Sequence, residues 1–129
     1  MSQYAANAYA AVEKITVSGR QLEASALFRT ARELQLAQES FGKPGNETKL
    51  DAALKLNQRL WTFFQAELEA SDNPLPPELK ASLLKLSMFV DRRTFELMAF
   101  PNPEKVAILI NINRNIAAGL STVPAVAGV

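Results

Sequence analysis

The chain has 129 residues, the size of one domain, and its 48% hydrophobic and 21% charged residues are typical of a globular protein. It contains no histidine and no cysteine, which excludes Ser-His-Asp and Cys-His catalysis, zinc sites built on these ligands, disulfides and the Glu-x-x-His di-iron sites of helical bundles. The formal net charge of +1 argues against binding that depends mainly on phosphate neutralisation or on a polybasic membrane contact.

Two helices are expected before the first strong break, which lies at residues 42–45. The first covers residues 2–17, is rich in alanine, and is expected to end near Ser18 and Gly19. Because Ser18 and Gln21 have the spacing of a capping box, a second helix is expected to begin there. The Gly-Lys-Pro-Gly sequence at the break ends this second helix. Its apolar stripe consists of Ala24, Leu27, Ala31 and Leu34.

The third expected helix begins at Asn46, a favourable N-cap residue. It carries the strongest apolar stripe in the chain, at helical spacing: Leu50, Ala53, Leu54, Asn57, Leu60, Trp61, Phe64 and Leu68. Its charges run against the helix dipole, because basic residues come first and acidic residues last. They are Lys49, Lys55, Arg59, Glu67, Glu69 and Asp72. Either pairing with neighbouring helices or a partner of complementary charge would explain this order.

Two further helices complete the expected fold. Pro76 and Pro77 suit the first turn of the fourth helix, and Asn102 and Pro103 suit the N-cap and first position of the fifth. Residues 108–113 partly alternate like a strand, but we expect a helix because the start signal is specific and no second strand is available for pairing. The sequence therefore predicts an all-α fold, a compact antiparallel bundle of about five helices with short loops.

The bundle is expected to form a single domain over residues 1–120, followed by an uncharged tail over residues 121–129. Pro124 prevents the tail from being one continuous helix. The tail is either a frayed end or a segment that covers part of a partner-binding groove until the partner displaces it.

The chain offers few groups for chemistry. Its carboxylates mostly stand singly at surface positions, and it has neither a phosphate-binding glycine loop nor a calcium-binding loop. Arg92 and Arg93 are the only adjacent basic pair, so nucleic acid is not expected as a partner. Asn57 and Asn113 fall on apolar stripes, where they either fix helix register or contact a partner. We expect a non-enzymatic interaction domain without metal or cofactor, whose apolar residues leave a groove for an amphipathic helix.

No apolar run approaches the about 20 residues that cross a bilayer, and no basic residue precedes Lys14. The sequence therefore predicts neither a membrane span nor a secretory signal. The absence of cysteine is typical of a cytoplasmic protein. We expect a cytoplasmic location without membrane insertion.

Several strings over residues 4–120 carry a resemblance to a known family. They are Leu-Asn-Gln-Arg-Leu-Trp at 56–61, Asn-Pro-Leu-Pro at 73–76, Leu-Lys-Leu-Ser at 84–87, Val-Asp-Arg-Arg-Thr at 90–94 and Leu-Ile-Asn-Ile-Asn-Arg-Asn-Ile at 109–116, followed by Gly119 and Leu120. A weaker likeness lies at residues 18–23, where the second expected helix begins. In their order and spacing these strings resemble the FlaF family of alphaproteobacterial flagellar biosynthesis regulators.

The resemblance implies a cytoplasmic protein of flagellum biogenesis that binds the terminal amphipathic helices of flagellin, as an export chaperone and a regulator of flagellin synthesis. An alternative is translational control through flagellin mRNA, and in either role a second flagellin regulator is a possible partner. The third and fifth helices are expected to pack together through a buried hydrogen bond of Asn57 or Asn113. The candidate partner-binding residues come from the family-like strings and the adjoining stripe: Asn57, Arg59, Leu60, Trp61, Phe64, Val90, Arg93, Ile110, Asn113 and Arg114.

Overall fold

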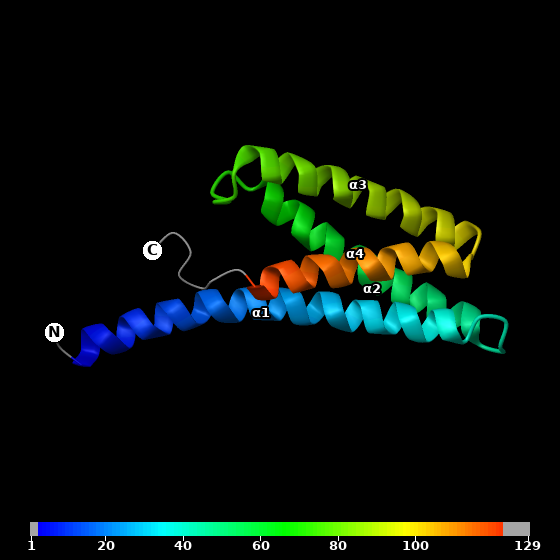
Figure 1. Ribbon diagram of the computed structural model, residues 1–129, viewed down its shortest axis with the longest axis horizontal. Coiled ribbons are helices and arrows are strands. Elements are labelled where there is room, and N and C mark those ends of the chain that lie inside the picture. The colour runs from blue at the N-terminus through cyan, green and yellow to red at the C-terminus, as the bar shows by residue number, and fades with distance from the viewer. Residues whose placement is uncertain (1–2, 123–129) are drawn as a thin grey trace.

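The computed structural model describes the backbone of residues 3–122 and the side chains of residues 21–121. This part of the chain forms four α-helices and no strand: α1 (Gln3–Glu39), α2 (Asn46–Glu69), α3 (Pro77–Ala99) and α4 (Pro103–Thr122). Successive helices run in opposite directions (Figure 1). The predicted all-α antiparallel fold is therefore confirmed, including the helix expected over residues 108–113. No helix in the described ranges is both long and apolar enough to cross a bilayer.

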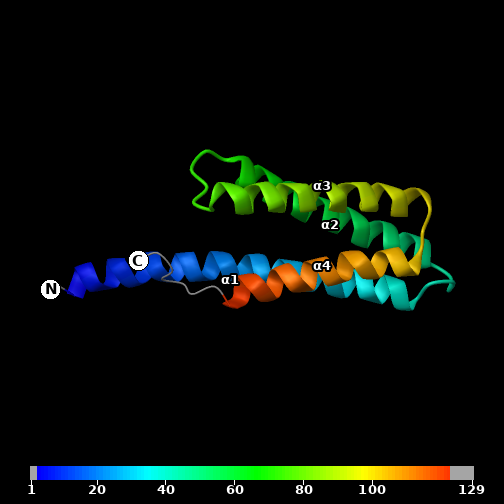
Figure 2. The ribbon, with the colours of Figure 1, turned by 45° about the horizontal axis from the view of Figure 1, so that its top comes forward.

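The helices form two layers (Figure 2). One layer is the pair of α1 and α4, and the other is the hairpin of α2 and α3. α2 also packs against α1, whereas α3 makes only slight contact with α4. Figure 1 shows that α3 and α4 are close at the loop that joins them and diverge away from it. We call the end with this loop the closed end of the bundle, and the opposite end the open end.

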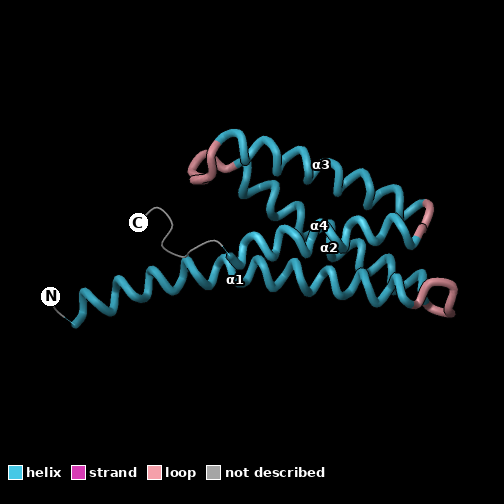
Figure 3. The backbone as a smooth tube through the Cα atoms, viewed as in Figure 1, coloured by secondary structure: helices cyan, strands magenta, loops and turns pink. Residues whose placement is uncertain are grey.

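The first two expected helices are one helix. α1 runs for 37 residues and passes through Ser18 and Gly19 without interruption (Figure 3). The predicted break and the predicted capping box of Ser18 and Gln21 are therefore wrong, and the bundle has four helices rather than about five. A glycine inside a helix costs only about 1 kcal/mol relative to alanine, whereas proline, which does break helices, is absent from α1. The cost of one glycine is therefore too small to end the helix.

Replacing Gly19 with alanine is expected to raise the free energy of unfolding by about 0.5–1 kcal/mol, because alanine loses less backbone entropy in a helix. Urea denaturation followed by circular dichroism measures this change. The matched control is Gly45→Ala, which is expected to destabilise the protein because Gly45 has φ +81° in the loop before α2. A destabilising Gly19→Ala would mean that the chain turns at Gly19 and that α1 is two helices.

Asn46 begins α2 but does not cap it. The residue before the helix is Gly45, and no side-chain hydrogen bond caps this helix. The buried Asn46 side chain instead donates from Nδ2 to the carbonyl oxygen of Ala37, at 2.5 Å, and to Oγ of Ser40, at 2.9 Å. The predicted N-cap is therefore wrong, because the tight loop turns the amide back onto α1. Asn46 thus provides a hydrogen-bond donor to a carbonyl group near the carboxyl end of α1 and links α1 to α2.

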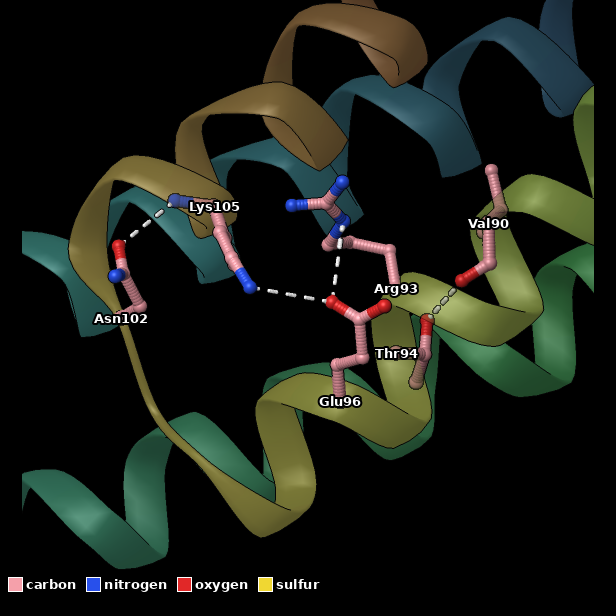
Figure 4. Close-up of polar contacts among 6 residues, drawn as sticks. All are labelled: Val90, Arg93, Thr94, Glu96, Asn102 and Lys105. Atoms are coloured by element: carbon pink, nitrogen blue, oxygen red, sulfur yellow. Dashed lines mark hydrogen bonds and ion pairs between the residues drawn. The ribbon is translucent and has the colours of Figure 1, made fainter.

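The predicted start of α4 is confirmed. Oδ1 of Asn102 accepts a hydrogen bond from the backbone N–H of Glu104, at 2.9 Å. It also accepts one from the backbone N–H of Lys105, at 3.2 Å (Figure 4). Nζ of Lys105 also lies 3.3 Å from Oε2 of Glu96 on α3, and Nε of Arg93 lies 3.8 Å from the same oxygen. The Lys105 contact links the start of α4 to the end of α3 at the closed end of the bundle, whereas the Arg93 contact lies within α3.

The core lies between the two layers. α1 contributes alternating alanine and leucine residues, and small side chains let a neighbouring helix approach closely, which fits the tight packing of α1 on α4. The residues of this buried apolar cluster are Ala24, Leu27, Ala31, Leu34, Ala37, Leu50, Ala53, Leu54, Trp61, Val90, Leu97, Val106, Leu109, Ile110 and Ala117. The uncharged tail expected over residues 121–129 lies outside the described residues from residue 123 onward, and its first two residues belong to α4.

Candidate partner-binding site

A pocket of about 400 Å³ opens at the open end of the bundle, where α2 ends and α3 begins. All four helices and the loop between α2 and α3 contribute to its mainly apolar walls. We call it the end pocket. Its lining residues are Glu23, Trp61, Phe64, Glu67, Leu68, Ala70, Asp72, Asn73, Pro74, Leu75, Leu83, Ile116 and Leu120.

Trp61 is the most buried aromatic residue in this lining, and only 2% of it is exposed. Its indole Nε1 donates a hydrogen bond to Oδ1 of Asn113 on α4, at 2.9 Å. Nδ2 of Asn113 in turn donates to Oδ1 of Asn57 on α2, at 2.7 Å. These bonds connect α2 to α4 across the core. The predicted buried hydrogen bond of Asn57 or Asn113 between these two helices is confirmed. The predicted packing of the two helices is not, because among the described residues α2 makes its close backbone contacts with α1 and α3.

The asparagine network has more donors than acceptors. Nδ2 of Asn57 is buried and has no acceptor among the described residues, and both asparagines are fully buried. A buried donor without a partner costs about 1–3 kcal/mol, so the network does not maximise stability. It does hold the indole ring of Trp61 in one orientation at the base of the end pocket.

Aromatic and aliphatic side chains form the walls around Trp61. The Phe64 ring meets the Trp61 ring edge to face, with 5.8 Å between centroids and an interplanar angle of 85°. Such an arrangement stabilises the pair in addition to the stabilisation that comes from the buried apolar area. Leu83 from α3 and Ile116 and Leu120 from α4 face the same pocket and are partly exposed. The end pocket therefore offers an apolar surface that solvent and a partner can reach.

The family-like string at residues 73–76 shapes the mouth of the end pocket. Nδ2 of Asn73 donates to the carbonyl oxygen of Glu67 in the last turn of α2, at 2.9 Å, and Oδ1 of Asn73 accepts from the backbone N–H of Leu75, at 3.0 Å. The carbonyl oxygen of Asn73 accepts from Nζ of Lys80 on α3, at 3.2 Å. Asn73 thus ties the loop to both helices, which places Pro74 and Leu75 in the pocket wall.

Among the described residues, no charged side chain of α2 forms an ion pair with a neighbouring helix. One of the two explanations for the order of its charges required such pairs. Across the described part of the chain, the only ion pair on α2 joins Lys55 to Asp51, at 2.8 Å, within the helix itself. The other charges that run against its dipole have no ion-pair partner in the described residues. These are Lys49, Arg59, Glu67, Glu69 and Asp72.

The structure brings only two of the predicted partner-binding residues, Trp61 and Phe64, into the end pocket. Arg59 and Arg114 are exposed, and a guanidinium nitrogen of Arg114 donates to Oε1 of Gln35 on α1. Leu60 and Arg93 are partly exposed; the others are buried in the bundle: Asn57, Val90, Ile110 and Asn113. Partner binding by these residues stays a prediction, and the buried ones act on a partner only through the residues that they position.

Other end-pocket residues were not among the predicted site residues. The α2 stripe continues from Trp61 and Phe64 to Leu68 at helical spacing, and this continuation was the signal that could have identified Leu68. Leu83 lies on the same apolar stripe as Val90, and Leu75 lies in a loop, so no local pattern shows that they face a pocket. They do so only after α3 has folded back along α2. Arg93 lies over the Phe89 ring, 5.1 Å from its centroid, and not in the end pocket.

A second pocket, of about 540 Å³, lies near the closed end. Its lining mixes Phe41, Leu97 and Met98 with charges of both signs on Lys43 and Glu47. None of the predicted site residues lines it. The end pocket is more apolar and contains residues of three family-like strings, so it is the better candidate for a partner-binding site.

Comparison with known proteins gives one match. The family model described as "Flagellar protein FlaF" matches residues 5–120, which include α2, α3 and nearly all of α1 and α4. No curated protein and no solved structure matches the chain.

Proposed function

Because the chain belongs to the FlaF family of flagellar proteins, we propose that it binds flagellin and that its end pocket receives an amphipathic helix from a flagellin terminus. In this role the protein is a cytoplasmic, non-enzymatic export chaperone that also regulates flagellin synthesis. The observation that carries the proposal is the apolar end pocket, which collects Trp61, Leu75 and Ile116 from three family-like strings.

The shape of the open end fits recognition of a helix in a groove. Such recognition uses apolar anchors at helical spacing that enter an apolar surface on the receiving protein. Phe64, Leu83 and Leu120 come from three different helices and provide that surface. The amino-terminal part of α1 extends beyond the end of α4 (Figure 2), so a bound helix would lie beside additional backbone.

Covering a flagellin terminus has a direct consequence for assembly. The terminal helices of flagellin are the surfaces that pack together in the filament, so a partner that buries them keeps flagellin from assembling before export. The end pocket and other flagellin subunits would then compete for the same terminal helices. The concentration of unbound protein would therefore determine how much flagellin is able to assemble. That link is a physical basis for both the chaperone role and the regulatory role.

Co-expression with full-length flagellin from the same bacterium is expected to give a complex that survives size-exclusion chromatography at micromolar concentration. Hydrogen exchange is expected to slow in residues 64–76 and in the last turns of α4, because these segments form the end pocket. Exchange in the loop at residues 42–45 serves as the internal control and is expected to stay unchanged. Flagellin without its terminal helices is expected not to bind.

Absence of a complex with full-length flagellin would contradict the proposal. Binding to flagellin mRNA that weakens steeply with salt, without any affinity for flagellin, would instead support translational control. Protection confined to the closed end would show that flagellin binds the protein but not the end pocket.

A further inference from the structure

The ionisable residues that line the end pocket all have one sign, and Lys80 lies next to the lining without belonging to it. The ionisable lining residues are Glu23, Glu67 and Asp72, and no lysine or arginine belongs to the lining. The pocket at the closed end differs, because Lys43 lies there beside acidic residues. An occupant of the end pocket therefore meets an apolar surface with acidic residues at its edge.

The acidic residues at this edge are unfavourably placed in the free protein. Glu67 lies in the last turn of α2, and Asp72 follows soon after the helix ends. The unpaired carbonyl groups at the end of a helix carry partial negative charge, so carboxylates there are repelled. Both residues are exposed and form no ion pair with any described residue. Lys80, at the start of α3, donates to the carbonyl oxygen of Asn73 instead.

We infer that the end pocket selects a helix with lysine or arginine beside its apolar stripe; the inference rests on the proposed function and specifies the chemistry of the bound segment. Residues three or four apart on a helix are neighbours, so a basic residue one turn from an apolar anchor can reach the pocket edge. The apolar anchors enter between Phe64 and Leu83, while the basic groups pair with Glu67 and Asp72. Charge complementarity of this kind steers association and suppresses binding of acidic helices.

The test is the double substitution Glu67→Lys and Asp72→Lys, with the Kd for full-length flagellin from the same bacterium measured by calorimetry. At about 0.1 M salt the Kd is expected to rise about tenfold, since two attractive charge pairs become repulsive. At about 0.5 M salt the difference from the unmodified protein is expected to shrink, because exposed charges are then strongly screened.

The matched control is the double substitution Glu33→Lys and Glu39→Lys on α1. It makes the same change in net charge, places a lysine at the last residue of a helix, and lies outside the lining of the end pocket. Lysine at the carboxyl end of a helix is favourable, so both double variants are expected to keep or slightly raise their thermal midpoint. The control is expected to bind flagellin with unchanged affinity.

An unchanged or tighter Kd for the Glu67 and Asp72 variant would overturn the inference while leaving flagellin binding intact. A loss of affinity that is equal at both salt concentrations, or that the control shares, would also overturn it. If the unmodified protein does not bind flagellin, the proposed function fails and this inference fails with it.

Discussion

Replacing Asn113 with alanine is expected to lower the free energy of unfolding by about 2–5 kcal/mol. Asn113 is the centre of the hydrogen-bond network, so its loss leaves both the indole N–H of Trp61 and Oδ1 of Asn57 buried without partners. Each such group costs about 1–3 kcal/mol, and the space vacated by the amide adds to the cost. Urea denaturation followed by fluorescence measures the change, since Trp61 is the only tryptophan in the chain.

Two companion variants make this prediction specific. Asn57→Ala is expected to cost less, about 1–3 kcal/mol, because it leaves only Nδ2 of Asn113 without an acceptor. Asn115→Ala, on the exposed side of the same helix, is expected to change stability by less than about 0.5 kcal/mol. If Asn113→Ala costs no more than Asn115→Ala, the buried network does not hold α2 and α4 together.

Replacing Leu83 with aspartate is expected to weaken flagellin binding by about a hundredfold or more, as loss of a central apolar anchor does in other interfaces. The new carboxylate would be buried against the partner's apolar side chains and would lie in a pocket that is already acidic. The fold is expected to survive, because Leu83 is partly exposed and does not belong to the buried core. Calorimetry with full-length flagellin measures the affinity, and circular dichroism checks the fold.

Leu36→Asp is the matched control for this substitution. It makes the same chemical change on α1, at a leucine that is 46% exposed and lies outside both pockets. Its affinity for flagellin is expected to equal that of the unmodified protein. If Leu83→Asp binds as tightly as Leu36→Asp, flagellin binds at another surface, and the end pocket is not the site.

The sequence by itself determined the fold class and the major breaks between helices. Glycine and proline act through their own backbone geometry, so the breaks at residues 42–45 and near Pro77 and Pro103 could be predicted without knowledge of their neighbours. Asn102 caps α4 through bonds that span only a few residues. Asn57 and Asn113 stood out as amides on apolar stripes, because helical spacing indicates burial before any packing is known.

Only the tertiary structure decided the features that depend on several helices at once. Gly19 weakens a helix by only about 1 kcal/mol, so the local pattern does not decide whether the chain breaks there, and the structure shows that α1 continues through it. Asn46 has the composition of a cap, yet the turn of the loop directs its amide to Ala37. The end pocket joins residues from all four helices, because the lengths and divergence of the helices determine which part of each apolar stripe stays uncovered. Helical spacing predicts that an apolar residue faces inward. Only the packed helices determine whether that residue belongs to the core, as Val90 does, or to a pocket wall, as Leu83 does.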